Sequence, residues 1–419
     1  MKEKSTVLPL KNPANFNADP LNDLLKEGAK KLIQMAIETE IQEYLSQHES
    51  LRTPDNRLTV VRNGYLPERE IQTGIGPINI KIPKIRSRSE ESFIFKSTLI
   101  PPYVRKSKSL ECVIPWLYLK GISSGDMQEP LMHLVGAEAK GLSASTITRL
   151  KQVWGEEYKQ WKQKDLSKDK WVYIWADGIH SGFRHDEGSK LCTLVVIGVN
   201  EYGEKHFLAI EDGTRESTQS WREVLLHMKK KGVKAPQLGI GDGALGFWGA
   251  LDEVFPDTRH QRCWVHKMAN ILNHMPKTLQ PKAKSDLQEI WMSDTKENAI
   301  KAMKNFIEIY GSKYIKSVEN LKKDKETLLA FYDFPAEHWR SIRTSNPIES
   351  VFGTIRHRTR QSKGCLSREG MLHMIFKLGI SAEKNWRKIK GFQELGKVIT
   401  GVKFRDGIEC KIEKNQKAA

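Results

Sequence analysis

Two aspartates follow directly on short apolar segments of the chain. Asp177 ends the segment WVYIWAD and Asp242 ends LGIGD, and neither segment contains a basic residue. A buried carboxylate is unfavourable unless it is paired or binds a metal ion. Each aspartate is also explained as a turn residue before glycine, and Asp242 could cap a following helix. As a pair, they predict two carboxylates that meet at the carboxyl ends of adjacent strands and bind a divalent cation.

A third carboxylate, Glu349, lies near the start of the helical pattern SNPIESVFGTIRHRTR. We expect Asn346 to cap this helix, so that Glu349 falls at position N3, where a capping box would explain it without any catalytic role. The same helical face carries Gly353, Arg356 and Arg360, at spacings of four, three and four residues. Because arginine binds phosphate oxygens bidentately, this face favours a phosphodiester held beside a metal ion.

Three carboxylates are suited to metal-dependent chemistry at phosphorus. Mg²⁺ prefers oxygen ligands and keeps coordination positions for water and substrate phosphate. Two ions about 4 Å apart stabilise both the attacking and the leaving oxygen of an in-line displacement, which then needs no serine or cysteine nucleophile. The sequence contains neither a G-x-x-x-x-G-K-[ST] nor an H-E-x-x-H motif. We therefore expect Mg²⁺ or Mn²⁺, as two ions, to be the cofactor.

Net charge is distributed unevenly along the 419 residues. The chain has 68 Lys and Arg against 51 Asp and Glu, a formal charge of +17. Residues 171–260 carry −3, whereas residues 51–110 and 346–419 carry +7 and +9. Basic segments bind the phosphates of a nucleic acid, and an acidic centre repels them unless cations intervene. The distribution favours a metal-dependent enzyme that acts on nucleic acid, although chance alone can also give one such segment this charge.

The residues from 171 onward contain the elements that must position the carboxylates. Three apolar runs, WVYIWADG, KLCTLVVIGV and KHFLAIED, are bounded by Gly, Asp and Asn and indicate strands. A helix, a strand, a second helix and a short strand follow. This order predicts an α/β fold with a mixed sheet and crossover helices. Residues 264–335 and 346–395 have helical patterns.

The N-terminal part of the chain has mainly helical patterns. Residues 20–48 have apolar side chains at helical spacing, whereas residues 70–83 alternate around a Gly-Ile-Gly turn and predict a β-hairpin. Residues 109–162 contain two short helical patterns with a glycine-containing connection. They resemble a helix-turn-helix unit whose second helix would expose Arg149 and Lys151 to DNA. Such helix pairs are equally common in other helical domains.

Other features restrict the class of protein. The five cysteines are odd in number and scattered, which indicates reduced thiols rather than a disulfide framework. No apolar run approaches the roughly 20 residues of a membrane span. The N-terminus lacks the apolar region of a secretory signal. We expect a cytoplasmic, nucleoid-associated bacterial protein with no membrane partner.

Longer motifs resemble those of a known family. The segments WADGIH, IGVNEYGEKHFLAIEDGTRESTQSW, LGIGDGALGFWGAL, FPDTRHQRCWVHKMANIL and HWRSIRTSNPIESVFGTIRHRTRQSKGCLSREGMLHMIFKL occur in this order. They are similar to the Mutator-type transposases of bacterial insertion sequences, within the DDE recombinase superfamily. The resemblance covers residues 171–391 closely and residues 60–165 more loosely.

The resemblance implies an RNase H-like core in which Asp177, Asp242 and Glu349 form the catalytic and metal-binding triad. The long gap between the last two carboxylates would hold a helical insertion, and the basic residue seven positions after the glutamate corresponds to Arg356. Many members have asparagine and further arginines after the glutamate, whereas this chain has glycine at 353 and histidine at 357. This departure leaves the individual phosphate contacts open.

The C-x-x-H motif of the family corresponds to Cys263 and His266, at the junction between core and insertion. One such pair supplies half of a zinc site, and no second pair with suitable spacing follows. Three roles stay open on the sequence alone. A structural or substrate-positioning role is favoured over direct catalysis, and zinc binding is the least favoured.

The predicted organisation has six parts. In chain order they are a helical and β-hairpin DNA-binding region (1–105), a helix-turn-helix-like DNA-binding region (106–168), the first part of an RNase H-like core (169–263), a helical insertion (264–340), the final core helices (341–395) and a C-terminal tail (396–419). Phosphate contacts are expected from basic side chains in and after two helices: Arg149, Lys151, Arg356, Arg358, Arg360 and Lys363.

The sequence thus predicts a DNA transposase that binds terminal inverted repeats and catalyses metal-dependent cleavage and strand transfer. Its partners would be the double-stranded DNA of the element ends and of the target, and we expect a homodimer on DNA because two ends must be paired. One alternative is a catalytically inactive or domesticated DNA-binding relative, against which the three carboxylates argue. The other is an RNase H-like nuclease or resolvase, against which the helix-turn-helix-like region and the insertion argue.

Overall fold

The chain forms two compact units, residues 1–150 and residues 151–419, each with hydrophobic cores of its own. The computed structural model describes residues 20–119, 122, 126–135, 144–182, 190–213, 216–361 and 367–410. Lys363, one of the predicted phosphate contacts, lies outside the described residues. Among the helices that are described, none is both long and apolar enough to cross a membrane.

The first unit begins with one continuous helix, α1 (Pro20–Gln47), which packs against antiparallel strand pairs. β1 (Val60–Tyr65) pairs with β4 (Pro83–Ser87), and β2 (Arg69–Thr73) pairs with β3 (Gly76–Ile80). The β2–β3 pair confirms the predicted hairpin. Isoleucines from the helix, from β2 and β3, and from the link between β3 and β4 form a shared core: Ile37, Ile71, Ile78, Ile80 and Ile82.

Three helices follow these strands. They are α2 (Lys108–Leu119), α3 (Gln128–Val135) and α4 (Ala144–Lys162). The last two match the predicted helix pair, but the connection between them, residues 136–143, lies outside the described residues. The helix-turn-helix interpretation therefore stays a prediction.

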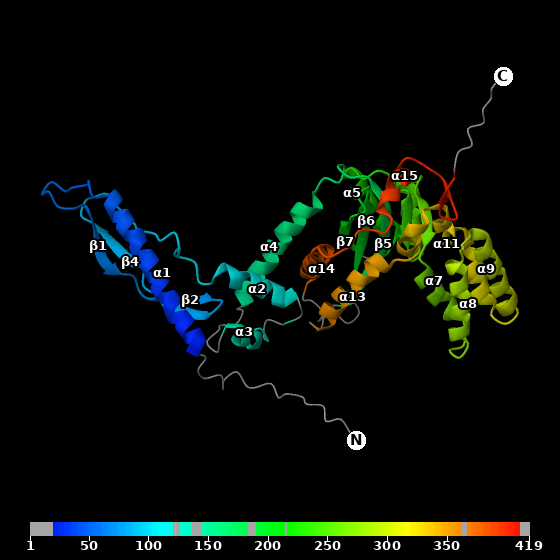
Figure 1. The fold of residues 1–419 in the computed structure, drawn as a ribbon, viewed down its shortest axis with the longest axis horizontal. Helices are drawn as coiled ribbons and strands as arrows, with labels where there is room; N and C mark the ends of the chain where they lie inside the picture. Colours follow the sequence, from blue (N-terminus) through cyan, green and yellow to red (C-terminus); the bar gives the residue numbers. More distant parts are fainter. Residues whose placement is uncertain are drawn as a thin grey trace, which may run out of the picture. The chain divides into compact units, whose positions relative to one another are not determined.

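A five-stranded mixed sheet forms the centre of the second unit (Figure 1). Its strands are β5 (Trp171–Gly182), β6 (Lys190–Asn200), β7 (Lys205–Gly213), β8 (Leu238–Gly241) and β9 (Arg259–Arg262). Their spatial order is β7-β6-β5-β8-β9. β5, β6 and β7 are antiparallel, whereas β5, β8 and β9 are parallel. The predicted mixed sheet with crossover helices is thereby confirmed.

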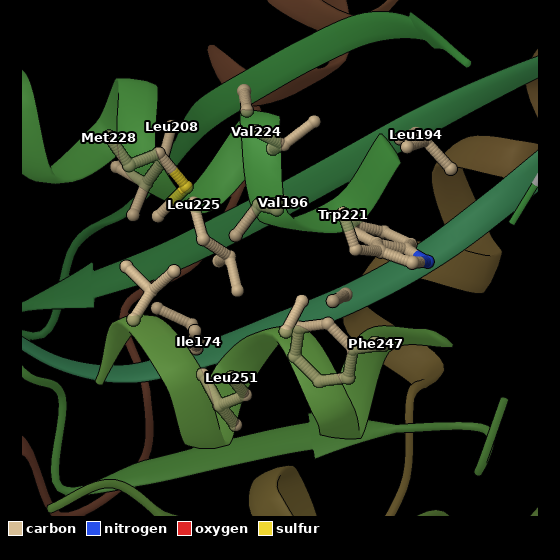
Figure 2. Close-up of a cluster of buried hydrophobic side chains, with 14 of the residues drawn as sticks. Ile174, Leu194, Val196, Leu208, Trp221, Val224, Leu225, Met228, Phe247 and Leu251 are labelled. Carbon is tan, nitrogen blue, oxygen red and sulfur yellow. The ribbon is translucent and has the colours of Figure 1, made fainter. Parts of the chain in front are cut away.

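The two crossover helices, α5 (Thr218–Lys230) and α6 (Leu245–Val254), cover one face of this sheet. Figure 2 shows Leu225 of α5 and Leu251 of α6 packed near Ile174 of β5, with Phe247 and Trp221 beside them. All five of these side chains are almost fully buried. Burial of this apolar surface is the main term that stabilises the α/β layer.

The opposite face of β5 carries the side chains at odd positions, since successive residues of a strand point to opposite faces. The Tyr173 hydroxyl contacts Nδ1 of His338 at 2.8 Å, and the Trp175 indole donates to the carbonyl of Ser341 at 3.2 Å. These contacts fix the segment that leads into α13 against the sheet. Asp177 has the same parity, so it lies on the face that receives α13.

The segment between β9 and α13 is helical, as predicted. Its main helices are α7 (Trp264–Leu272), α8 (Gln280–Met292), α9 (Lys296–Tyr310), α10 (Ile315–Lys323) and α11 (Lys325–Leu328). Neighbouring helices pack on one another, α7 on α8 and α10, and α8 on α9 (Figure 1). Short turns complete the segment: η2 (Ala330–Asp333), η3 (Ala336–His338) and α12 (Trp339–Ile342).

Two helices of sixteen residues each, α13 (Asn346–Gln361) and α14 (Arg368–Glu383), return to the sheet. α13 contacts β5, and α14 contacts β7. The final elements are short: η4 (Phe392–Glu394), α15 (Leu395–Ile399), β10 (Phe404–Arg405) and β11 (Ile408–Glu409).

Candidate catalytic site

Asp177 and Asp242 are neighbours because β5 and β8 run parallel. The last residue pair of these two strands is Ala176 and Gly241, and each aspartate is the next residue along its own chain segment. β5 itself continues to Gly182, so Asp177 does not end its strand, as the sequence suggested. It lies just beyond the last residue of β5 that pairs with β8, so no residue of β8 lies beside it in the sheet.

Each aspartate accepts one short hydrogen bond from the backbone. Gly178 N donates to Asp177 Oδ1 at 2.8 Å, and Ala244 N donates to Asp242 Oδ1 at 2.8 Å. The second bond closes a turn, in which Gly243 has a φ of +93° that favours glycine. Ala244 is the N-cap of α6, and no side chain caps that helix. Asp242 therefore acts as a turn residue, and its second oxygen is not needed for capping.

The electrostatic environment of Asp177 is unfavourable to a carboxylate. Burial, followed by repulsion from Asp242, raises the pKa of Asp177 to about 7. Among the residues that the structure describes, no Lys or Arg forms an ion pair with either aspartate. The positive charge of His266 acts in the opposite direction on the Asp177 pKa. A cation bound between the two carboxylates would remove their repulsion.

Glu349 lies in the first turn of α13, one position later than the sequence suggested. Ile348 N and Glu349 N both donate to the carbonyl of Ser345, at 2.9 and 3.1 Å. The cap position therefore belongs to Ser345, and the expected cap Asn346 is already helical. The Ser345 hydroxyl donates to Glu349 Oε1 at 3.2 Å. This bond holds the glutamate by its side chain, which is 33% exposed.

Cys263 and His266 meet Glu349 at the start of α7. Cys263 N donates to the carbonyl of Gly241, the residue before Asp242, at 2.8 Å. Ser345 N donates to Cys263 Sγ at 3.2 Å, and His266 Nε2 lies 3.4 Å from Glu349 Oε1. The C-x-x-H motif thus joins the end of β8 to the first turn of α13.

The thiol and the imidazole shift each other's titration. The hydrogen bond with Cys263 raises the pKa of His266 to about 9, against the effect of burial. Burial would raise the pKa of the Cys263 thiol, but hydrogen bonds from His266 and Ser345 outweigh it and lower that pKa. A positive imidazolium is therefore favoured beside the acidic centre.

The predicted phosphate contacts are only partly described. Arg356 is exposed on α13, with its guanidinium 5.7 Å from the ring centre of Phe352. The backbones of Arg358 and Arg360 lie in the same helix, and those of Arg149 and Lys151 lie in α4. The side chains of these four residues are outside the described part of the structure.

Two residues near the site were missed by the sequence reasoning. Ser345 precedes an Asn-Pro pair that looks like a better start for the helix. Glu216 lies in the loop before α5, and its Oε1 is 3.1 Å from His180 Nε2. A Cβ on Gly178 would be only 2.0 Å from the same glutamate oxygen. The glycine that follows Asp177 was a signal that a side chain approaches there.

Two groups of side chains have ligand atoms within 4.8 Å of one another in the described residues: Cys263, His266 and Glu349 in one group, and His180, Cys192 and Glu216 in the other. The first group includes one of the predicted triad residues. In the second group, His180 lies on β5 three residues after Asp177, Cys192 lies on β6, and Glu216 lies in the loop before α5.

Known proteins resemble this chain over most of its length. The family model "Transposase, Mutator family" matches residues 1–389. The transposase for insertion sequence element IST2 of Acidithiobacillus ferrooxidans is 48% identical over 287 residues, which are 68% of this chain and 97% of that protein. The transposase for element IS6120 of Mycolicibacterium smegmatis is 46% identical over 295 residues, 70% of this chain and 91% of the relative.

A more distant relative extends over a larger part of the chain. The transposase for element ISRM5 of Rhizobium meliloti is 25% identical over 368 residues, 87% of this chain and 89% of that protein. The family model and the two relatives above 45% identity agree with the resemblance seen in the sequence motifs. The chain therefore belongs to the Mutator family of transposases.

Proposed function

We propose that this transposase cuts and joins DNA strands at the ends of an insertion sequence, with Asp177, Asp242 and Glu349 as its catalytic carboxylates. The observation that carries the proposal is the pairing of Ala176 with Gly241, which makes the two aspartates neighbours at the end of parallel strand pairing. The relatives are named as transposases for insertion sequence elements, which supports element ends as the substrate.

The sheet supports an RNase H-like core. Three antiparallel strands are followed by two parallel ones, and the first strand of the chain segment lies at the centre of the order β7-β6-β5-β8-β9. The helices between β9 and α13 form the insertion that separates Glu349 from the two aspartates in sequence. The six-part organisation, with DNA-binding regions before residue 169, belongs to the same proposal.

The donor set fits a hard divalent cation. Carboxylate oxygens are the ligands that Mg²⁺ and Mn²⁺ prefer. Burial and, after it, repulsion from Asp242 raise the pKa of Asp177, and a cation would remove this repulsion. When bound, two such ions would neutralise charge on the phosphate and on the attacking and leaving oxygens. The residues of the chain would hold the ions and orient the scissile phosphate.

The reaction would consist of two displacements at phosphorus. In the first, water attacks a phosphodiester at the element end, the P–O3′ bond breaks, and the strand is left with a free 3′-hydroxyl. In the second, this hydroxyl attacks a phosphodiester of the target. One P–O bond forms as another breaks, so the joining step needs no external energy source.

Cys263 and His266 would act as positioning residues for Glu349. His266 Nε2 lies 3.4 Å from Glu349 Oε1, Cys263 Sγ accepts from the backbone N–H of Ser345, and the Ser345 hydroxyl donates to the same glutamate. The imidazolium also reduces the negative charge near Asp177. These contacts favour a supporting role over direct catalysis.

DNA binding would use the basic parts of the chain on both sides of the acidic centre. Residues 51–110 and 346–419 carry +7 and +9, and Arg356 projects from the helix that also carries Glu349. Phosphate contacts release counterions, so affinity for an element end should fall steeply as salt rises. A homodimer would bring two ends together.

The direct test uses a DNA duplex that contains one element end, with Mg²⁺ or Mn²⁺, and maps nicks to the nucleotide. We expect Asp177→Asn, Asp242→Asn and Glu349→Gln each to abolish cleavage while the gel-shift affinity for the end is kept. Asp252→Asn is the matched control, because this aspartate of α6 is 64% exposed and its ion-pair partner among the described residues is His260. Normal cleavage by the three variants would overturn the catalytic assignment.

The products also separate the alternatives. Nicking without any joining to a target would indicate a nuclease or resolvase. End binding by the wild-type protein without cleavage in either metal would indicate an inactive relative.

A further inference from the structure

Three side chains with nitrogen, sulfur and oxygen donors lie together near the outer end of β5: His180, Cys192 and Glu216. One ligand atom of each lies within 4.8 Å of the ligand atoms of the other two. The three residues come from different elements, namely β5, β6 and the loop before α5. No step of the proposed reaction uses them, and none is a proposed catalytic carboxylate.

Strand register places His180 and Cys192 on one face of the sheet. The two residues are directly opposite each other in the antiparallel β5–β6 ladder, and the side chains of such a pair lie side by side on the same face. Cys192 belongs to the apolar core that residues of α5 and α6 complete. Asp177 is three residues before His180 on the strand, so its side chain points to the opposite face. The group is therefore separate from the pair of aspartates.

Gly178 leaves the space that the third donor occupies. It lies on the same face as His180, two residues earlier, and a Cβ at this position would overlap Glu216 Oε1 and lie 2.6 Å from the carboxyl carbon. Any other residue at 178 would displace the carboxylate. The backbone of Glu216 is also held, since a Cβ on Gly246 of α6 would lie 2.5 Å from its carbonyl oxygen. Two glycines thus admit Glu216 to its place beside the histidine.

The separations are close to those around a tetrahedral zinc ion. His180 Nε2 lies 3.1 Å from Glu216 Oε1, and nitrogen and oxygen ligands at about 2.0 Å from a tetrahedral Zn²⁺ are about 3.3 Å apart. A thiolate at about 2.3 Å would lie roughly 3.6 Å from each of them. The Cys192 sulfur is already within 4.8 Å of both partners, and the His180 side chain, which is 53% exposed, can rotate to close the difference.

The chemistry of the donors selects a softer cation than Mg²⁺. Thiolate and imidazole ligands suit Zn²⁺, whereas Mg²⁺ prefers oxygen. Within the described part of the chain, His180 is the ion-pair partner of Glu216, and no Lys or Arg pairs with it. Burial and, after it, the negative charge of Glu216 raise the pKa of the Cys192 thiol to about 12. A bound Zn²⁺ would offset both effects, because it deprotonates a coordinating thiol.

We propose that His180, Cys192 and Glu216 bind one Zn²⁺ ion, which ties the outer part of β5 to β6 and to the loop before α5. Beyond Ala176 this strand no longer pairs with β8, and its register continues with β6 alone. The ion would hold this extension from the face that carries Cys192. Three protein ligands leave the fourth position to water. The inference does not depend on the catalytic assignment of the three carboxylates.

The test measures metal binding to the full-length protein. Zinc is supplied in equimolar amount, and the zinc retained after dialysis is determined by elemental mass spectrometry. Co²⁺ then replaces Zn²⁺, because a thiolate bound to Co²⁺ gives a charge-transfer absorption. We expect one Zn²⁺ per chain and a Co²⁺ spectrum that contains this absorption.

Substitution of each ligand should weaken the binding of Co²⁺. His180→Gln, Cys192→Ser and Glu216→Gln should each cost more than the tenfold to about hundredfold that loss of an outer contact to a ligand costs, and Cys192→Ser should also remove the thiolate absorption. Gly178→Ala should reproduce the loss in affinity, since it displaces the Glu216 carboxylate. Matched controls at exposed positions should bind Co²⁺ as wild type does: Glu223→Gln, His274→Gln and Cys410→Ser.

His180→Gln keeps the test decisive if a substitution of the buried cysteine prevents folding, because the histidine is half exposed. Zn²⁺ should raise the melting temperature of the wild type, since a ligand of the native state stabilises it. The melting temperature of His180→Gln should not respond. An equal rise in both proteins would overturn the inference.

Two further outcomes would overturn it. One is a wild-type protein that retains no zinc and gives no thiolate absorption with Co²⁺. The other is an absorption that Cys263→Ser removes and Cys192→Ser keeps, because the ion would then lie at the other group of donors. Asp177→Asn should retain zinc while it loses cleavage. The zinc site and the catalytic assignment can therefore fail independently of each other.

Discussion

Two acidic regions contact the short segment 262–267, and they differ in how their negative charge is balanced. In the first, Asp324 receives Lys267 Nζ at 2.5 Å and Arg262 Nη1 at 3.0 Å. In the second, Asp177 faces Asp242, and its pKa is raised because burial and the second carboxylate both oppose its charge. The first region has two cationic partners within the chain, whereas in the second the described residues include no Lys or Arg partner and His266 compensates the charge only in part.

The difference distinguishes a structural ion pair, Lys267 with Asp324, from the candidate catalytic site at Asp177 and Asp242. The Lys267 side chain is only 1% exposed, and its pairing with Asp324 fastens α7 to the end of α10. The two charges of this pair neutralise each other, so neither is available to bind a substrate. Asp177 and Asp242 have no Lys or Arg partner among the described residues, and a bound cation would balance the charge that they carry. His266, one residue before Lys267, is directed to the second region and reduces this charge without removing it.

The largest effect should come from Asp177→Asn, which removes activity without removing stability. We expect cleavage of an element end to fall by about a thousandfold or more, because the cation loses a ligand. The free energy of unfolding in metal-free buffer should stay equal or rise, since a repelled carboxylate becomes a neutral amide. Chemical denaturation and single-turnover cleavage measure the two quantities.

Mg²⁺ provides a control for this prediction. Ligands that bind only the native state stabilise it, so Mg²⁺ should raise the melting temperature of the wild type but not that of Asp177→Asn. A large loss of stability in this variant without metal would show that Asp177 is structural, like Asp324.

The second-largest effect is expected in the region of Lys267 and Asp324, where a substitution should lower stability and leave cleavage unchanged. Asp324→Asn leaves Lys267 buried without a full negative charge, and we expect a loss of about 3 kcal/mol in the free energy of unfolding. Cleavage per folded molecule should change little, because the proposed catalytic carboxylates are untouched. Lys267→Met in the same background should recover part of the stability, since it removes the unpaired charge. If cleavage falls as far as it does in Asp177→Asn, the two regions are not separate.

A smaller effect is expected for His266→Gln. The change removes the positive charge 3.4 Å from Glu349 Oε1 but leaves the carboxylates in place. Loss of an outer contact to a ligand usually costs tenfold to about a hundredfold, so cleavage should fall by that range and Mg²⁺ affinity should weaken. His274→Gln, an exposed histidine in the turn after α7, serves as the control. An unchanged rate would leave the C-x-x-H motif with a purely structural role.

Sequence reasoning could predict the sheet and the neighbouring placement of the two aspartates, because both depend on local patterns. Apolar runs that end in Asp-Gly mark strands, and parallel strands bring their ends together wherever the crossover helices lead. The cap of α13 was placed one residue late, at Asn346 instead of Ser345, because the Asn-Pro pair fits a helix start equally well. What decided the matter was the contact of Ser345 with Cys263, which no local pattern contains.

Glu216 and Lys267 could not be predicted for a different reason. Both are charged residues in polar surroundings of the sequence, where exposure is the expected state. Their burial follows from tertiary packing, of Glu216 against Gly178 and of Lys267 against Asp324. Two features of the sequence hint at this packing: the glycine after Asp177, and the lysine directly after the histidine of the C-x-x-H motif. Neither identifies the partner residue, which only the structure shows.

The smallest effect is expected for a histidine–glutamate contact between β7 and α14. It is measured as the pH dependence of the free energy of unfolding. His206 Nδ1 lies 2.9 Å from Glu383 Oε1, and this hydrogen bond raises the pKa of His206. A raised pKa in the native state gives a stabilisation that is fully present below the unfolded value of about 6.5 and is lost as pH rises through the native value. Because the histidine is 35% exposed, solvent screening should keep the effect below about 1 kcal/mol. We therefore expect wild type to exceed His206→Asn in unfolding free energy at pH 5.5 by more than it does at pH 8.5. Equal differences at the two pH values would mean that this pair, unlike Lys267 with Asp324, contributes only as a neutral hydrogen bond.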